Sequence, residues 1–301
     1  MSEEQVPTDG RHPEWLKVRM EGGKERVEMH RLLRNSSLHT VCESAKCPNL
    51  CDCWKRRTAT FMILGNTCTR CCRFCAVSHG RPEPVSPEEP KRIAEAVQSL
   101  GLKYAVITCV TRDDLPDGGS TAMAETVRAV REMCPGVKVE VLCSDYNGRF
   151  EDIDRVLHAL PVVFGHNVET VRRLTPQIRS KASYDGSLAV LRHAAEQVKA
   201  EELAVQVKSG LMLGLGETEG EIRECLGDLR AAGVTTVTMG QYLRPTPENW
   251  PVSRYVTPQE FASWQKIAEG EYGFARAVCG PLIRSSYLAE EAYERANGNV
   301  Q

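Results

Sequence analysis

Short apolar runs and helical stretches alternate along the chain from Thr58 onward, and this alternation limits the possible folds more than any other feature. The predicted strands are Thr58–Leu64, Tyr104–Val110, Lys138–Leu142, Val162–Gly165, Ala204–Met212 and Thr235–Gln241. The predicted helices are Pro87–Ser99, Ser120–Cys134, Phe150–His158, Gly186–Lys199, Thr218–Ala232 and Thr257–Gly270. This order is typical of βα units around a parallel sheet. It predicts an α/β protein, either a flat doubly wound sheet or a partial barrel, and the strand pattern alone leaves both open.

Polar and chemically versatile residues collect where the predicted strands end. These segments are Cys68–Cys75, Thr111–Gly119, Ser144–Asp145, His166–Glu169, Lys208–Gly210 and Gln241–Arg244. In both architectures ligands bind at the carboxyl ends of the strands. We therefore expect one functional site at this edge of the sheet.

Composition excludes several classes of protein. A chain of 301 residues is long enough for one large domain or two ordinary ones. Its formal charge is -2 and it has no basic stripe, which argues against nucleic acid as a partner. No apolar run approaches the roughly 20 residues that cross a membrane. The N-terminus, Met-Ser-Glu-Glu-Gln, lacks the pattern of an export or organelle signal, so we expect a reducing cytoplasm where thiols stay free.

The cysteines are crowded. Eight of the 13 lie between residues 42 and 75, and such crowding indicates metal or disulfide chemistry. Cys68, Cys72 and Cys75 have the spacing C-x3-C-x2-C on one short loop. Closely spaced thiolates hold iron–sulfur clusters, and three of them account for three irons of a [4Fe–4S] cube. The fourth iron would then be open to a ligand that is not protein.

A second cysteine set lies upstream, where Cys42, Cys47 and Cys53 have the spacing C-x4-C-x5-C. Two alternatives to iron–sulfur clusters remain. Disulfides are disfavoured because no export signal is present. Zinc is a stronger alternative, because Cys71 and Cys72 each complete a C-x2-C pair in the downstream loop; such pairs, however, normally come from separate loops.

A C-x3-C-x2-C motif after the first strand of a βα array resembles the radical S-adenosylmethionine (SAM) enzymes, and within them the chain is similar to the lipoyl synthase family. The shared motifs are the upstream triplet, Thr58–Gly65, Arg112–Gly119, Asn167–Thr170, Lys208–Thr218, Gly240–Leu243 and Arg284-Ser-Ser-Tyr287. The downstream triplet marks only the superfamily, whereas both triplets with the terminal motif are more specific. The resemblance implies a partial (β/α)6 TIM-like barrel over residues 58–280. An N-terminal extension (1–57) would carry an auxiliary cluster loop, and a C-terminal tail (281–301) the Arg-Ser-Ser-Tyr motif.

The resemblance also implies a reaction. SAM would bind the open iron of the cluster on the downstream triplet, and its reductive cleavage would give a 5′-deoxyadenosyl radical. That radical would take hydrogen from a protein-bound octanoyl-lysine chain. A second [4Fe–4S] cluster on the upstream triplet would donate sulfur at C6 and C8, giving the lipoyl group. The alternatives are another radical SAM sulfurtransferase acting on a small molecule, and a non-catalytic metal-cluster module.

Further site residues follow from the resemblance. Ser286 would be the fourth ligand of the auxiliary cluster, with Ser285 as the alternative. From the sequence alone, Ser285-Ser286 is more simply interpreted as the N-cap of a final helix, Tyr287–Ala296, because such caps are common. SAM would contact Phe74, Asn167, Glu169 and Lys208, although each of these residues also suits a purely structural contact. Cys51 and Cys71 lie beside the triplets but outside the family pattern.

Protein partners are implied in the same way. They are octanoylated lipoyl carrier domains, such as those of 2-oxoacid dehydrogenase subunits and the glycine cleavage H protein. A one-electron donor such as ferredoxin or flavodoxin would reduce the radical cluster, and cluster-assembly proteins would serve the auxiliary one.

Overall fold

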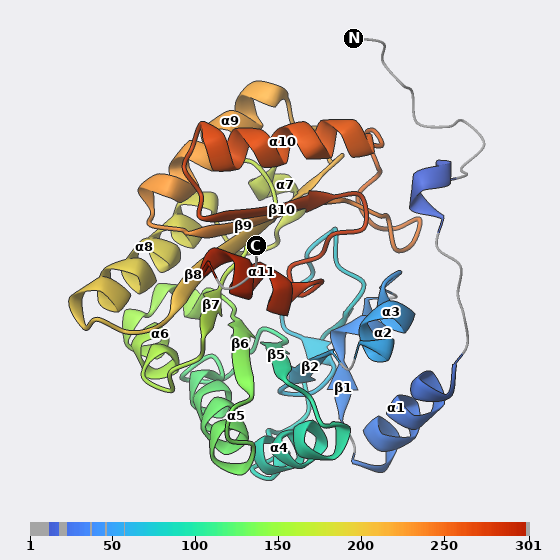
Figure 1. Cartoon of the computed structure of the whole chain (residues 1–301), viewed down its shortest axis with the longest axis vertical. Coiled ribbons are helices and arrows are strands. Elements are labelled where there is room, and N and C mark those ends of the chain that lie inside the picture. Colours follow the sequence, from blue (N-terminus) through green and yellow to red (C-terminus); the bar gives the residue numbers. More distant parts are fainter. Residues whose placement is uncertain (1–11, 18–22, 37, 46, 57, 299–301) are drawn as a thin grey trace.

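The computed structural model describes residues 12–17, 23–36, 38–45, 47–56 and 58–298. Its main sheet has eight strands in the order β1-β2-β5-β6-β7-β8-β9-β10 (Figure 1). The strands are β1 (His39–Thr40), β2 (Ala59–Ile63), β5 (Tyr104–Cys109), β6 (Lys138–Leu142), β7 (Val163–Gly165), β8 (Gln206–Leu213), β9 (Thr236–Gln241) and β10 (Arg276–Gly280). All neighbours are parallel except β1, which runs antiparallel to β2. The sheet curves into an incomplete barrel whose edges are β1 and β10.

Helices cover the outer face of this sheet (Figure 1). They are α4 (Glu89–Leu100), α5 (Ser120–Met133), α6 (Phe150–Leu157), α8 (Tyr184–Ala200), α9 (Glu219–Ala231) and α10 (Pro258–Gly270). Each turns an apolar stripe inward; α5, for example, buries Met123, Val127 and Val130 against the sheet. Two of the helices begin with capping boxes, at Thr218 and Thr257, which satisfy the first backbone N–H groups.

The six predicted strands and six predicted helices are all present, with ends that differ by one or two residues. The barrel, rather than the flat doubly wound sheet, is the architecture that forms. Two strands of the main sheet were not predicted, β1 because it is only two residues long and β10 because its segment lacks a long apolar run. The sequence also predicts a short helix around Glu14–Arg19. The structure has a 3₁₀ turn over Glu14–Leu16, and residues 18 and 19 lie outside the described residues.

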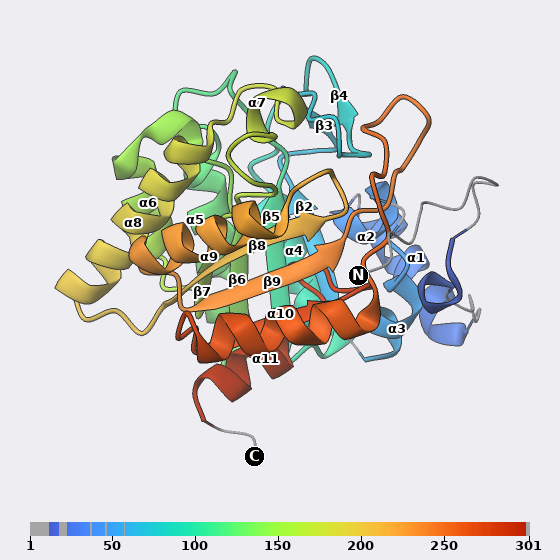
Figure 2. The same cartoon turned by 90° about the horizontal axis from the view of Figure 1, so that it is seen from above.

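Shorter elements lie at the two ends of the barrel. At one end are β3 (Thr67–Cys68), β4 (Ser78–His79), the 3₁₀ turn Tyr146–Gly148 and α7 (Thr175–Ile178). The N-terminal segment forms α1 (Lys24–Asn35), α2 (Val41–Ser44) and α3 (Leu50–Lys55) beside β1 and β2. Figure 2 shows β3, β4 and α7 on one side of the strands and α11 (Ala289–Ala296) on the opposite side.

The C-terminal tail turns back into the barrel after β10. The Ile283 N–H donates to the Gly280 carbonyl, and α11 packs its Ala289 against Tyr104 and Val106. Figure 1 shows α11 in front of the centre of the ring of strands. The tail therefore closes the barrel at the end opposite to β3 and β4.

The tail also contacts the N-terminal cysteine loop. Asn49 Nδ2 donates to the Leu282 carbonyl (2.6 Å), and the Tyr287 hydroxyl donates to Asp52 Oδ2 (3.1 Å). Segments from both ends of the sequence thus meet beside the edge strands. Among the described residues, no helix has the length and apolarity needed to cross a membrane.

Candidate active site

The C-x3-C-x2-C loop follows the first long strand and begins at the end of β3. Its fold aims backbone N–H groups at sulfur: Arg70 N lies 3.4 Å from Cys68 Sγ, and Val77 N lies 3.4 Å from Cys75 Sγ. The Cys75 N–H donates to the Cys72 carbonyl (3.0 Å), which closes a turn between the second and third cysteines of the motif. Hydrogen bonds to sulfur are a usual feature of cluster-binding cysteines and tune the reduction potential of the cluster.

The thiols of this loop interact electrostatically. Burial, with smaller contributions from the neighbouring Cys72 and Cys68 as thiolates, raises the pKa of Cys75 to about 11. Three thiolates at one place would repel one another in a partly desolvated loop. Iron between them would remove this repulsion, so the donor set fits a cluster.

One side of the loop is anchored by Arg70, whose side chain is almost fully buried. Its Nη2 donates to Asp113 Oδ1 (2.8 Å), Asp145 Oδ1 (2.7 Å) and Asn147 Oδ1 (2.9 Å). Burial alone would raise the pKa of Asp145, but the hydrogen bonds and charge of Arg70 hold it at about 2. Arg70 therefore fixes the segment between the first two cysteines to the loops that follow β5 and β6.

The other side of the loop is held at Arg73. The Arg73 N–H donates to the Ile178 carbonyl (2.8 Å), while its own carbonyl accepts from Trp250 N (2.8 Å) and Asn249 Nδ2 (3.1 Å). Asn249 Nδ2 also donates to the Cys75 carbonyl (3.0 Å). The Arg73 guanidinium stacks 4.5 Å above the Trp250 ring. The loop is thus clamped between α7 and the segment after β9.

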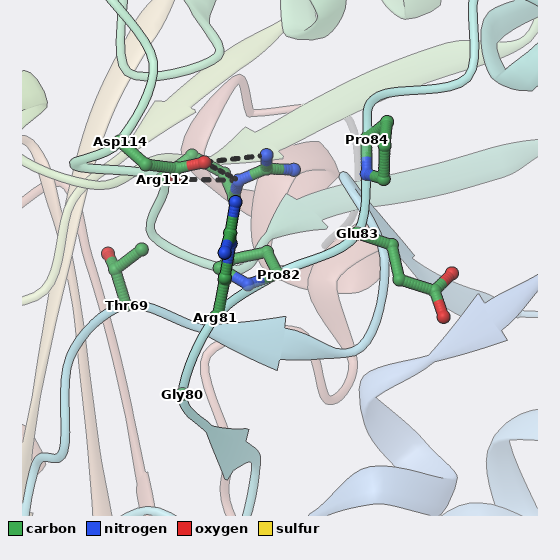
Figure 3. Close-up of a pocket in the computed structure, with 8 residues that line it drawn as sticks. All are labelled: Thr69, Gly80, Arg81, Pro82, Glu83, Pro84, Arg112 and Asp114. Carbon is green, nitrogen blue, oxygen red and sulfur yellow. Dashed lines mark hydrogen bonds and ion pairs between the residues drawn. The ribbon is translucent and has the colours of Figure 1, made fainter.

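The aspartate-rich segment after β5 organises the rim beside this loop. Arg112 Nη2 donates to Asp114 Oδ2 (2.8 Å), and Asp117 accepts from Gly119 N (3.0 Å) at the start of α5. Figure 3 shows the Arg112–Asp114 pair on one side of a pocket of about 480 Å³ and residues 80–84 on the other. Thr69, next to the first cysteine, lines the same pocket.

The upstream triplet lies on α2, α3 and the turn between them. Burial, with a smaller contribution from Cys47, raises the pKa of Cys42 to about 11. Burial, with smaller contributions from Cys42 and Cys47, raises the pKa of Cys53 to about 12. The three thiols therefore lie near enough to interact electrostatically. Cys51 is two positions from Cys53 on a helix, and residues at that spacing do not share a face.

The Arg-Ser-Ser-Tyr motif lies against this upstream triplet. Tyr287 bonds Asp52, which stands between two cysteines of α3, and the Arg284 charge acts on the Cys47 thiol. Ser286 is flanked by these two contacts in the chain. A pocket of about 280 Å³ is lined by Cys53 on one side and residues 287–291 on the other.

The serines do not cap the final helix, so that prediction was wrong. The helix begins at Ala289, and its N-cap is Leu288, which has a φ of 55° and makes no side-chain cap. Tyr287 and Leu288 are therefore outside the helix. The physical reason is that Ser285 is engaged elsewhere: its Oγ accepts from Asn167 Nδ2 at 2.6 Å.

Asn167 and Glu169 follow β7 at the carboxyl end of the barrel strands. Burial raises the pKa of Glu169, and the nearby Arg179 charge opposes this effect. Glu169 also acts electrostatically on Cys75. Its backbone has a φ of 67° and bonds on both sides to β8, through Gly210 O (3.1 Å) and Met212 N (2.9 Å). Non-glycine residues whose backbone is held in the left-handed region often occur at functional sites.

Lys208 and Phe74 are placed differently. Lys208 Nζ donates to Glu140 Oε1 (2.7 Å), both side chains are buried, and Tyr104 donates to the other carboxylate oxygen (2.6 Å). The Lys208 charge is thus already neutralised within the barrel, and a bound carboxylate would compete with Glu140. Phe74 packs its ring against the core, consistent with its structural interpretation.

All 13 cysteines are free, so the disulfide alternative was wrong. In the described part of the chain, no three His, Cys, Asp or Glu side chains converge closely enough to share one metal ion. The fit to iron–sulfur cubes rests instead on the chemistry of the donors: two thiol triads, partly desolvated, with N–H groups directed at sulfur in the downstream one. Cys71 is exposed, and its N–H donates to Ser180 Oγ (3.2 Å).

Sequence reasoning missed the residues that hold the cysteine loops. Arg70, Arg73, Asn249 and Trp250 gave no signal except that two of them lie inside the cysteine motif. Their partners follow other strands, so only the fold brings them together.

Comparison with known proteins decides the family. The sequence model of the Radical SAM superfamily matches residues 62–229, more than half of the chain. A lipoyl synthase of Rubrobacter xylanophilus is 52% identical over 289 residues, covering 95% of this chain and 88% of the relative. One from Thermus thermophilus is 49% identical over 292 residues, covering 96% and 89%. The chain belongs to the lipoyl synthase family.

Solved structures support the fold. A maturase of the [FeFe]-hydrogenase has a TM-score of 0.57 at 13% identity, over 92% of this chain and 67% of that one. Methylornithine synthase has a TM-score of 0.54 at 16% identity, over 82% and 70%.

As a member of the lipoyl synthase family, the chain is a radical SAM sulfurtransferase, with SAM and two [4Fe–4S] clusters as cofactors. Its reaction is the family's sulfur insertion into an octanoyl chain, which gives the lipoyl group. The predicted family, fold and reaction are confirmed.

Proposed function

We propose that the two cysteine triads of this chain hold the two clusters and that both clusters serve one cavity inside the barrel. The downstream triad, Cys68, Cys72 and Cys75, holds the cluster to which SAM binds. The upstream triad, Cys42, Cys47 and Cys53, holds the auxiliary cluster that donates sulfur. When bound, these groups supply the carbon radical and the sulfur atoms; the protein positions them and excludes water.

The observation that carries this proposal is a chain of contacts between the triads. The carboxylate of Glu169 acts electrostatically on Cys75, and Asn167, two residues before it, donates to Ser285. Ser285 precedes the proposed auxiliary ligand Ser286. A substrate carbon must reach both a radical and a sulfur, so the two clusters must face each other, and these contacts support that arrangement.

Ser286 completes the auxiliary site in this proposal. Tyr287 and Arg284, on either side of it, both act on the upstream cysteine loop. Oxygen suits iron in a cluster less well than thiolate does, so this corner is the one that opens most easily when sulfur leaves.

Asn167 and Glu169 are proposed to contact SAM. The Glu169 carboxylate suits the positively charged amino group of the methionine part, and the Asn167 amide suits the ribose hydroxyls. The backbone of Phe74, inside the cysteine loop, would contact the adenine. Lys208 could reach the SAM carboxylate only by leaving Glu140.

The division of the chain follows from these roles. Residues 1–57 carry the auxiliary loop, residues 58–280 the barrel, and residues 281–301 the tail. The partners are octanoylated lipoyl domains, as in 2-oxoacid dehydrogenase subunits and the glycine cleavage H protein. A ferredoxin or flavodoxin supplies electrons, and cluster-assembly proteins renew the auxiliary cluster, all in a reducing cytoplasm.

The test is an anaerobic assay with an octanoyl-lysine peptide, SAM and a reductant, read by mass spectrometry. We expect products with one and then two added sulfurs, from protein that holds about eight irons per chain, as two cubes require. A Cys42→Ala/Cys47→Ala/Cys53→Ala variant should still cleave SAM but add no sulfur. Sulfur insertion by that variant, or iron content of one cube in the wild type, would contradict the assignment of the triads.

A further inference from the structure

The hydrogen bond between Asn167 and Ser285 joins two parts of the molecule that the proposed function uses separately. Asn167 follows β7 at the carboxyl end of the barrel strands, where SAM is proposed to bind. Ser285 belongs to the C-terminal tail, which enters the barrel beyond β10. The donor–acceptor distance is 2.6 Å, and the donor is an amide N–H.

Strand β8 passes close to the side chains of Asn167 and Ser285 at Gly210. A Cβ added to Gly210 of β8 would lie 2.5 Å from Thr238 Oγ1, 3.0 Å from Asn167 Oδ1 and 3.2 Å from Ser285 Oγ. Only glycine lets the strand pass this close to the two side chains. Strand β8 and the side chains of Asn167 and Ser285 are therefore closely packed at this point.

Glu169 lies two residues after Asn167, and its charge acts on the Cys75 thiol of the radical cluster loop. The Asn167 amide donates to Ser285, so a ligand that accepts this N–H competes with Ser285 for it.

We propose that this bond couples the two cluster sites. Ser285 is a positioning residue that fixes the neighbouring auxiliary ligand, Ser286. Because Asn167 also contacts SAM in the proposed function, its bond to Ser285 depends on whether SAM is bound. When SAM engages Asn167 and Glu169, the amide is drawn from Ser285 and the serine corner of the auxiliary cluster loosens. Sulfur release is thereby favoured only when the radical source is in place. This inference rests on the proposed function of the two triads.

Coupling of this kind is reciprocal, so each site must respond to the other. SAM should speed the loss of iron from the auxiliary cluster, and loss of the Ser285 hydroxyl should change the affinity for SAM. Both effects can be measured without reductant, when SAM is bound but not cleaved.

The experiment follows iron release to a ferrous chelator from fully loaded enzyme, with and without SAM. The Cys42→Ala/Cys47→Ala/Cys53→Ala variant keeps only the radical cluster. The iron that it releases is subtracted from the total to give the release from the auxiliary cluster. We expect SAM to raise the auxiliary rate about fivefold in the wild type. Ser285→Ala should release this iron quickly with or without SAM. Its SAM dissociation constant should fall about fivefold, because SAM no longer has to draw the amide from Ser285.

Two controls separate coupling from a general loss of structure. Ser263→Ala removes an exposed hydroxyl that bonds only its own helix, at Gln259 O (3.1 Å), and should respond as the wild type does. In a double-mutant cycle, Asn167→Ala and Ser285→Ala should be non-additive for the release rate, because either removes the same bond.

The coupling is overturned if SAM leaves the auxiliary release rate unchanged in the wild type, or if Ser285→Ala keeps the full SAM response. Neither result touches the proposed function, which fails separately if the loaded wild type lacks a second cluster. Should Ser285→Ala lose the auxiliary cluster during preparation, the SAM dissociation constant decides alone. An unchanged constant then contradicts the proposal, and a shift of about fivefold supports it.

Discussion

Gly240 is the position where the C-terminal tail passes closest to a barrel strand. A Cβ at this position would lie 2.0 Å from the Ile283 carbonyl oxygen and 3.0 Å from its carbon. The Gly240 backbone is outside the left-handed region, so alanine would be strained by this contact alone. Carbon and carbonyl oxygen approach to about 3.3 Å, so Gly240→Ala requires a displacement of about 1.3 Å.

The tail rather than the strand should move, because β9 is paired on both sides, with β8 and β10. The displaced segment leads directly into Arg284-Ser-Ser-Tyr. A misplacement of about 1 Å in a reacting group can lower a rate by about 100-fold. We expect Gly240→Ala to lose sulfur insertion by about this factor, while overpacking lowers the free energy of unfolding by only about 1–3 kcal/mol.

The assay measures 5′-deoxyadenosine and the sulfur-containing products in the same anaerobic reaction. We expect 5′-deoxyadenosine to form at near the wild-type rate while product falls, because the radical cluster loop does not contact the tail at this point. Gly270→Ala is the matched control, since a Cβ there meets nothing within 4 Å. Wild-type product formation by Gly240→Ala, with unchanged iron content, would refute the role given to the tail.

Three further predictions concern single side chains. Ser286→Cys should keep its iron but insert sulfur about tenfold more slowly, because thiolate holds iron more firmly; undiminished transfer would exclude a need for a labile oxygen. The depressed pKa of Asp145 means that its pairing with Arg70 stabilises the fold above the usual aspartate pKa of 3.8 and is lost as the pH falls to about 2. In urea unfolding, the wild type should have a higher free energy of unfolding than Asp145→Asn at pH 6, and this difference should shrink by about 2 kcal/mol at low pH. A difference that does not change with pH would contradict this. Lys208→Met should lower the free energy of unfolding by roughly 3–5 kcal/mol by leaving Glu140 buried and unpaired. Lys208→Met/Glu140→Leu should recover most of that loss, and its SAM dissociation constant tests whether Lys208 has any part in binding.

The barrel was predictable because its signal is local. In each strand–helix unit, a short apolar run is followed by a stretch in which apolar residues recur every three or four positions. Capping residues such as Thr257 mark helix starts without reference to the rest of the chain. The strands missed were β1 and β10, which are short or weakly apolar and owe their structure to pairing with β2 and β9.

The two cysteine triads could also be predicted, because cysteines on one short loop have a recognisable spacing in the sequence. The contacts that hold these loops in place could not be predicted. Arg70 contacts Asp113 and Asp145 from two other loops, and the bond of Ser285 to Asn167 joins the C-terminal tail to the segment after β7. Gly240 illustrates the limit most simply: its contribution is the absence of a side chain, which becomes visible only when the tail lies beside it.

The auxiliary ligands proposed here come from opposite ends of the sequence. A cluster held by both Cys42 and Ser286 would cross-link nearly the whole barrel into one covalently closed loop, which restricts the unfolded chain more than a short loop does. Each turnover that consumes this cluster would also cut the cross-link. The spent enzyme would then be the state most exposed to proteolysis, and rebuilding the cluster would restore its durability together with its sulfur.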